Sequence, residues 1–157
     1  MKRFAILCVI GLTLLATGCS KDDDGQSLGY SKDESEALQV LNGSFIYDSG
    51  LNTTSIVFSP FPEPVKKKSS MNDVEMEFHG GMKYRDNYYD NDFYFYLDTG
   101  KKRIVAYSQH SEKSDYFNAL VGKIWEYTIV DENTIKLYDT DLSNPLLHTN
   151  TFIRDDR

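Results

Sequence analysis

The apolar and polar positions along the chain change their period once, close to Gly43. Between Asp33 and Leu41 the apolar residues recur at the spacing of a short helix, with Ser31 or Asp33 as its N-terminal cap. Beyond Gly43, apolar and polar residues alternate with a period of two, which is typical of half-buried strands. The chain is therefore predicted to be mostly β after one short helix.

Gly80 and Gly81 interrupt the clearest alternating segment. A hairpin turn at these glycines would place Tyr84 opposite Glu77 and turn the apolar residues that follow toward the acidic face. A strand that continues through both glycines keeps its apolar residues on one face. These residues are Val74, Met76, Phe78, Met82 and Tyr84. We therefore predict a bend in one long strand, which lets the sheet curl.

Alternation and turn residues together predict eight strands, joined mostly by short links. They are Phe45–Tyr47, Ile56–Phe58, Val74–Tyr84, Phe93–Leu97, Arg103–Tyr107, Ile124–Val130, Thr134–Tyr138 and His148–Arg154. Pro60, Pro62 and Pro64 are predicted to end the second strand, and Ser114–Leu120 to form a helical turn or a crossing loop. No segment provides a helix long enough for a parallel crossover. The predicted fold is a small antiparallel up-and-down barrel, with an open β-sandwich as the alternative.

The N-terminal segment has the pattern of a lipoprotein signal. Lys2 and Arg3 precede an apolar stretch, Phe4–Leu15, which is too short to span a bilayer. The small residues before Cys19 allow cleavage there, and the Cys19 thiol can accept a diacylglycerol. The predicted organisation is a signal peptide at 1–18, a flexible polar tether at 19–32 and one β domain at 33–157. We expect a monomer attached to a membrane through Cys19.

The residues after Cys19 resemble the export signal of surface lipoproteins in one phylum of Gram-negative bacteria. They are Lys21, Asp22, Asp23 and Asp24, which follow Ser20. In that group, a Lys and acidic residues directly after the lipidated Cys direct the protein to the outer leaflet. The resemblance implies an outer-membrane lipoprotein exposed at the cell surface. The alternative is that these residues are only an acidic spacer.

Processing would make the chain more acidic. The full chain has 17 Lys and Arg against 24 Asp and Glu. Removal of Lys2 and Arg3 leaves 15 basic residues and a formal net charge of -9. Such a surface repels nucleic acid, which is therefore not an expected partner. Because Cys8 lies in the signal and Cys19 carries the lipid, no disulfide can form within the mature chain.

Two segments resemble the lipocalin-like lipoproteins of the same bacterial group. The first segment is Leu41–Phe45, at the opening of the domain. The second is Trp125–Ile129 followed by Asp131–Leu137, which together have the family's order of strand, acidic turn and strand. Phe45 stands where lipocalins usually have the Trp of Gly-x-Trp. The resemblance spans residues 38–154 and implies a lipocalin-like barrel.

Few residues offer catalytic or metal chemistry. His79, His110 and His148 lie on separate segments and are predicted to be surface or strand-end residues. Segment 86–92 is rich in Asp and Asn but lacks the Gly and the bidentate Glu of an EF-hand loop, so we predict a turn between strands. Motifs for a nucleophile elbow, a phosphate loop and a dinucleotide site are absent. We therefore predict a non-catalytic protein without a cofactor.

Aromatic residues are the remaining candidates for a binding site. The candidate lining of a ligand pocket is Phe45, Phe58, Phe78, Phe93, Phe95, Trp125 and Tyr127. Core packing of a small barrel is the competing interpretation of the same residues. Strand alternation turns Tyr94 and Tyr96 outward, where an exposed pair could stack on sugar rings or on a partner protein.

Three function classes follow from these patterns. The first is a non-catalytic binding module for a small apolar ligand, a glycan or a protein. The second is a structural or assembly subunit that docks on another outer-membrane protein. The third is a hydrolase, which the missing motifs disfavour. A lined cavity would favour the first class, a filled barrel with an aromatic patch the second, and two buried facing carboxylates the third.

Substitution of Cys19 tests the lipid anchor. We expect Cys19→Ala to leave unprocessed or soluble protein, because no thiol remains to accept the diacylglycerol. Fractionation of cells followed by immunoblotting measures this. If the variant still sediments with the outer membrane, the anchor is not at Cys19.

A second variant keeps Cys19 and separates lipidation from export. Replacement of Lys21, Asp22, Asp23 and Asp24 with Ala should retain the lipid but protect the protein from protease added to intact cells. Unchanged protease sensitivity would identify these residues as spacer alone.

Overall fold

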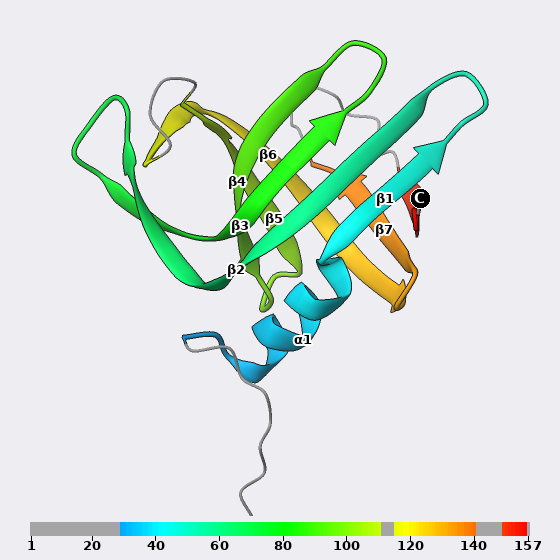
Figure 1. The fold of residues 1–157 in the computed structure, drawn as a ribbon, viewed down its shortest axis with the longest axis horizontal. Helices are drawn as coiled ribbons and strands as arrows, with labels where there is room; N and C mark the ends of the chain where they lie inside the picture. The colour runs from blue at the N-terminus through cyan, green and yellow to red at the C-terminus, as the bar shows by residue number, and fades with distance from the viewer. Residues whose placement is uncertain (1–28, 111–114, 141–148, 157) are drawn as a thin grey trace, which may run out of the picture.

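The computed structural model describes residues 29–110, 115–140 and 149–156. Within these residues it has one helix and eight strands. Their bounds are α1 (Lys32–Leu41), β1 (Gly43–Asp48), β2 (Thr53–Ser69), β3 (Glu75–Arg85), β4 (Asp90–Asp98), β5 (Arg103–Gln109), β6 (Tyr116–Asp131), β7 (Thr134–Asp139) and β8 (Thr149–Arg154). Consecutive strands pair antiparallel, and β1 also pairs with β8, so the sheet closes into a barrel (Figure 1). The predicted up-and-down barrel is confirmed, and the open sandwich is excluded.

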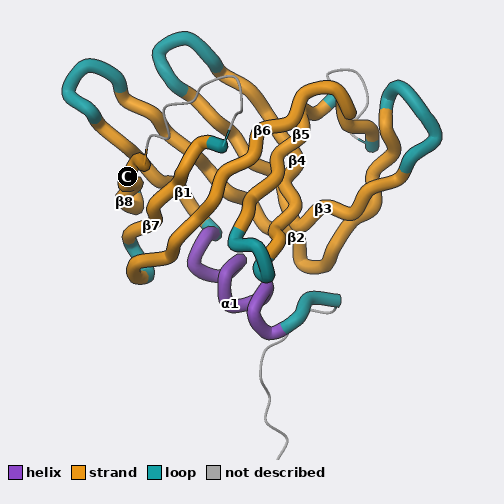
Figure 2. Tube along the Cα trace, turned by 180° about the vertical axis from the view of Figure 1, so that it is seen from behind, coloured by secondary structure: helices purple, strands orange, loops and turns teal. Residues whose placement is uncertain are grey.

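Helix α1 covers one end of the barrel, as both views of the chain show (Figure 2). Of the two predicted caps, Ser31 is the one observed: its hydroxyl accepts the Glu34 amide, while the Glu34 carboxylate accepts the Ser31 amide at 2.8 Å. This reciprocal pair satisfies backbone donors that the first turn leaves without partners. Leu38 and Leu41 are buried in the barrel core, as their spacing predicts. Below, this end is called the helix end and the opposite one the open end.

The seam that closes the barrel is short. β1 and β8 share two residue pairs, Phe45 with Arg154 and Ile46 with Ile153. All other neighbouring strands along the barrel share at least five pairs. Main-chain pairing alone therefore contributes little to closure at this point.

Arg154 reinforces the seam with its side chain. The guanidinium donates to the carbonyl oxygens of Val40 at 2.6 Å, Asn42 at 2.8 Å and Glu132 at 3.0 Å. Gly43 makes room for it, because a Cβ there would collide with the guanidinium, and the φ of Gly43, +136°, also favours glycine. One side chain thus joins the end of α1, the last strand and the turn between β6 and β7.

Buried side chains fill the barrel interior. The ring of Phe58 lies 6.3 Å from that of Phe45 and 5.5 Å from that of Phe95, both edge to face. Phe93, Trp125 and Tyr127 belong to the same core. An eight-stranded barrel is just wide enough to be filled by such residues, and burial of each Phe stabilises the fold by about 1.5–3 kcal/mol.

Strand β3 continues through Gly80 and Gly81, as predicted. Gly80 lies against the Phe95 ring and the Ser59 carbonyl, and a Cβ there would come within 2.5 Å of one ring carbon and 2.7 Å of the carbonyl oxygen. A Cβ at Gly81 would make only ordinary van der Waals contact, with the Gln109 side-chain nitrogen at 3.8 Å. The two glycines therefore have different roles: Gly80 admits the Phe95 ring, whereas Gly81 only shares the bend.

The prediction that the prolines end the second strand is wrong. β2 runs through Pro60, Pro62 and Pro64 to Ser69. Its pairing with β3 shifts register between Pro60 and Val65. Proline lacks an N–H donor and is tolerated at such an irregularity. The far halves of β2 and β3 form an arm that extends past the barrel (Figure 1), and the end of β2 pairs in parallel with the start of β6.

The arm covers a second aromatic cluster on the outer wall of the barrel. Its buried members are Phe78, Tyr94 and Phe117. Phe78 is therefore not with Met82 in the barrel interior, because the strand changes direction at the glycines between them. The predicted helical turn or crossing loop at 114–120 is likewise wrong from Tyr116 onward, where β6 begins.

His79 is buried within β3 at the helix end, which corrects its prediction as a surface or strand-end residue. It is 2% exposed. Its Nδ1 accepts the Leu97 amide at 3.3 Å, and its carbonyl oxygen accepts the Tyr30 hydroxyl at 3.0 Å. Burial lowers the pKa of His79, although Glu34 and Glu77 act in the opposite direction. The neutral imidazole is therefore part of the folded structure.

Tyr30 shows that the folded domain begins earlier than residue 33. It is 6% exposed and belongs to the barrel core, although the sequence assigns it to the tether. Cys19 and the predicted export signal at 21–24 lie outside the described residues. No helix in the described part of the chain is long and apolar enough to cross a membrane.

The two adjacent glycines allow a matched test of the bend. We expect Gly80→Ala to lower the free energy of unfolding by about 1–3 kcal/mol, because the new methyl group overpacks the Phe95 ring. Gly81→Ala should have a much smaller effect, since its Cβ meets nothing closer than 3.8 Å. Urea denaturation followed by circular dichroism measures both. Equal destabilisation by the two variants would contradict the packing role of Gly80.

Protonation of His79 should destabilise the domain. Its pKa is lower in the folded than in the unfolded state, so the unfolded chain binds the extra proton and stability falls as the pH drops below about 6.5. In His79→Asn the side-chain oxygen can still accept the Leu97 amide, and no titrating group remains. We expect this variant to lose less stability than the parent between pH 7 and pH 5 in urea titrations. His110→Asn is the control, and it should follow the parent.

Candidate functional site

The open end of the barrel carries inward-facing polar side chains above the aromatic core. Residues paired directly across neighbouring strands share one face of a sheet. Asp139 pairs with the core residue Trp125, and Lys123 pairs with the core residue Ala106, so both carry their side chains on the inner face. By the same argument Ser108, opposite Phe93, faces inward. We call this region the mouth.

Lys123 lies between two aromatic rings in the mouth. Its Nζ is 4.9 Å from the centre of the Tyr84 ring and 5.7 Å from that of Trp125. The two rings are stacked, with their centres 6.0 Å apart. Within the described residues, Lys123 makes no hydrogen bond or ion pair. The rings therefore hold the ammonium group by cation–π attraction and leave its three N–H donors available.

Asp86 connects this group to the rim of the barrel. Its Oδ2 accepts the Tyr84 hydroxyl at 2.9 Å, while its Oδ1 accepts the amides of Tyr88 and Tyr89 at 2.7 Å each. Partial burial opposes ionisation, but these three hydrogen bonds and the charge of Lys123 outweigh it and lower the pKa of Asp86. Asp86 is therefore a stable carboxylate.

Tyr84 stays protonated beside two carboxylates. Burial is the largest cause of its raised pKa, and the hydrogen bond to Asp86 and the charges of Asp86 and Asp139 add to it. The charge of Asp139 also raises the pKa of the Tyr84 hydroxyl, so Asp139 lies near it. The mouth therefore brings together the Lys123 ammonium group, the carboxylates of Asp86 and Asp139 and the Tyr84 phenol. These groups come from three strands and one turn.

Two neighbouring loops at the rim expose apolar side chains. Leu51, in the turn from β1 to β2, is 91% exposed, and Tyr88 and Tyr89, in the turn from β3 to β4, are 80% and 60% exposed. Asn87 ties the loops together by donating to the Asn52 side chain at 2.6 Å. The bonds to Asp86 hold the tyrosine backbone, so the loop presents both tyrosines on a fixed support.

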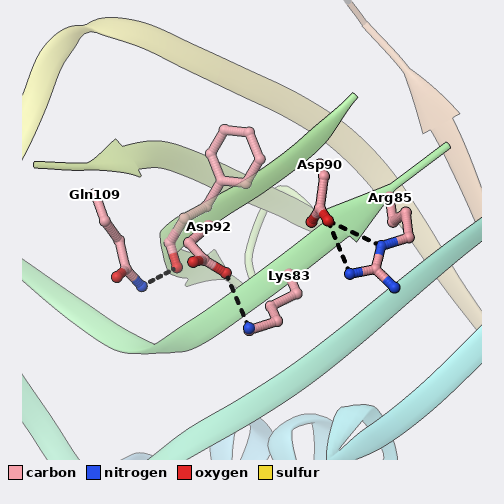
Figure 3. Close-up of polar contacts among 6 residues, drawn as sticks. Lys83, Arg85, Asp90, Asp92 and Gln109 are labelled. Carbon is pink, nitrogen blue, oxygen red and sulfur yellow. Dashed lines mark hydrogen bonds and ion pairs between the residues drawn. The ribbon is translucent and has the colours of Figure 1, made fainter. Parts of the chain in front are cut away.

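The acidic segment 86–92 is a turn between strands only over residues 86–89; from Asp90 onward it belongs to β4, which corrects the predicted bounds. On the outer wall, Arg85 donates to Asp90 at 2.8 Å and Lys83 lies 3.6 Å from Asp92 (Figure 3). With Asp86 engaged by the turn itself, these carboxylates are paired within the segment or with β3. No group of three or more His, Cys, Asp or Glu in the described part of the chain is arranged to hold a metal ion.

A hollow in the outer wall lies beside these ion pairs. Val57, Ser59, Gly81 and Gln109 contribute to its lining. The Gln109 amide donates to the Phe93 carbonyl oxygen at 3.0 Å (Figure 3), and Lys83 and Asp92 at its edge pair with each other. Because the protein's own groups already satisfy these partners, the hollow is a weaker candidate than the mouth.

Six of the seven candidate lining residues lie together in the barrel core. They are Phe45, Phe58, Phe93, Phe95, Trp125 and Tyr127, each at most 7% exposed. The structure thus places them as mutual packing partners and not as the wall of an open pocket. Phe78 lies apart from them, in the cluster under the arm.

The predicted exposed pair of Tyr94 and Tyr96 is wrong. Both point away from the lumen, but Tyr94 is 5% exposed beneath the arm, with Lys67 5.0 Å from its ring centre. Tyr96 is half-buried, 5.0 Å from the His79 ring. The exposed tyrosines are Tyr88 and Tyr89, which the sequence shows only as part of an acidic turn.

Sequence reasoning also missed Lys123 and Asp86. The inward position of Lys123 could have been found from its register, two residues before Trp125 on the same strand face. No comparable signal exists for Asp86, because its contacts depend on how the turn folds.

The chain matches no known protein family, no curated protein and no solved structure. The proposals below therefore depend on the geometry of the mouth and on the sequence of the N-terminal segment.

Proposed function

We propose that the protein is an outer-membrane lipoprotein, displayed at the cell surface, whose barrel is a non-catalytic binding module with its ligand site at the mouth. The observation that carries this proposal is Lys123. Lys123 is half-buried, and its ammonium group has aromatic rings beside it but no hydrogen-bond acceptor among the described residues. A bound ligand would supply the acceptor.

The position at which the folded domain begins supports a mouth that faces away from the membrane. Tyr30 packs beside α1, so the described part of the chain begins at the helix end (Figure 1). The mouth lies at the opposite end. An attachment through Cys19 would therefore leave the mouth accessible, and the resemblance of residues 21–24 to an export signal supports display outside the cell.

Charge at the mouth supports binding over hydrolysis. Hydrolysis by paired carboxylates needs one that stays protonated to act as an acid. Asp86 has the opposite property, because three hydrogen bonds and Lys123 stabilise its charge. A hydrolase is therefore the least favoured of the three classes.

A docking subunit is the second candidate. Leu51, Tyr88 and Tyr89 are exposed side by side on two loops that are tied together, and tyrosines on a rigid support are frequent in protein interfaces. In this alternative the rim would contact another outer-membrane protein and the mouth would hold no small molecule.

Native mass spectrometry of the protein purified from its host tests the binding function. We expect a bound small molecule at one per chain, and we expect Lys123→Met to lose it, because methionine preserves the length of the side chain but removes its donors. Lys101→Met is the matched control: Lys101 is an exposed lysine at the helix end, and its loss should leave the complex intact.

If the unmodified protein carries no bound molecule, the binding function is contradicted and the docking function is favoured instead. Loss of the bound mass in both lysine variants would show that general charge, and not the mouth, retains the molecule.

A further inference from the structure

The chemistry of the mouth also restricts the class of ligand. This inference rests on the proposed binding function, and it begins with the space available. Phe45, Phe58, Phe93 and Phe95 are at most 1% exposed and fill the lumen below the mouth. A long hydrocarbon chain would therefore have to displace packed aromatic rings. The ligand that fits the folded protein is one that stays at the mouth.

The charges of the mouth favour a neutral ligand. Lys123 supplies one positive charge, whereas Asp86 and Asp139 supply two negative charges close to the Tyr84 hydroxyl. The whole chain has a formal net charge of -7. A carboxylate or a phosphate that approached Lys123 would meet this excess of negative charge.

The same three groups suit a ligand with many hydroxyls. A hydroxyl can accept from the Lys123 ammonium and donate to a carboxylate, and hydrogen bonds to charged groups are stronger than those between neutral groups. Adjacent hydroxyls on one ring can use both kinds of partner at once. Neither an apolar molecule nor an anion has this combination of donors and acceptors.

The rim adds flat aromatic surface. Tyr88 and Tyr89 are exposed on the loop that Asp86 holds by two hydrogen bonds of 2.7 Å. Aromatic rings with a polar end can pack against the C–H face of a sugar ring while their hydroxyls remain in water. Because the loop is already ordered, less entropy is lost when a ligand binds there.

We infer that the mouth binds a neutral glycan, with the Lys123 ammonium and Asp86 Oδ2, which among the described residues accepts only the Tyr84 hydroxyl, contacting sugar hydroxyls, and with Tyr88 and Tyr89 packing against a sugar ring. The glycan is held without cleavage. The rim tyrosines thus contact the part of the glycan that lies outside the barrel. The polar groups of the mouth contact a terminal or side-branch sugar at the mouth.

Fluorescence of the single tryptophan provides the readout, because Trp125 lies directly beneath Lys123 and Tyr84. The mature lipidated protein is purified in a detergent without a sugar headgroup. The probes are neutral hexasaccharides of glucose, mannose, galactose and xylose, a hexasaccharide of galacturonic acid as the anionic counterpart, and palmitate. Isothermal titration calorimetry confirms each interaction independently of Trp125.

We expect at least one neutral hexasaccharide to change the fluorescence saturably, and the galacturonic acid counterpart to bind at least about tenfold more weakly. Lys123→Met should weaken binding by about tenfold or more, as expected for loss of a charged hydrogen bond. Tyr88→Ala and Tyr89→Ala, which alter exposed side chains, should weaken it several-fold. Lys101→Met should bind as the parent does.

Two other outcomes are distinguishable. Saturable, Lys123-dependent binding of palmitate or of the acidic hexasaccharide, without binding of any neutral one, overturns the glycan inference but retains the mouth as a binding site. No binding of any probe, together with a parent protein that carries no bound mass from its host, overturns both proposals.

Discussion

Arg154 joins the three chain segments that meet where the barrel closes. Backbone pairing between β1 and β8 is limited to two residue pairs and a hydrogen bond from the Asp155 amide to the Ser44 carbonyl oxygen. The Arg154 guanidinium adds bonds to Val40, Asn42 and Glu132. Because one of these carbonyl groups lies in α1, the same side chain fixes the helix across its end of the barrel. The difference between a covered end and an open end, and with it the position of the mouth, depends on this closure.

Closure also determines what the interior can hold. Eight strands enclose little more than the volume of their own inward side chains, and here that volume is occupied by large aromatic residues. Gly80 shows how tight the packing is, since the Phe95 ring occupies the space that a side chain would need. The proposed ligand site therefore lies above the filled lumen, at the end opposite α1.

Much of this architecture could be predicted from sequence. The cap at Ser31, the strand through Gly80 and the turn at 131–133 follow from local rules, because helix caps and alternating strands depend on residues close in the chain. The fate of Tyr94 could not be predicted in the same way. Alternation correctly turns it out of the lumen, but its burial depends on an arm from β2 and β3 that crosses the outer wall. That arm depends in turn on a strand that passes through three prolines.

The sequence by itself determined the strand order, six of the seven aromatic residues predicted to face inward and the expectation of a lipid-anchored surface protein, because each of these depends on short-range pattern. Only the tertiary structure decided which polar groups meet. Lys123, Asp86 and Asp139 are far from one another in sequence, and Tyr88 and Tyr89 belong to a turn whose composition suggests nothing beyond solvent exposure. Their convergence results from strand register around a closed barrel, which brings side chains of different strands to the same height at one end.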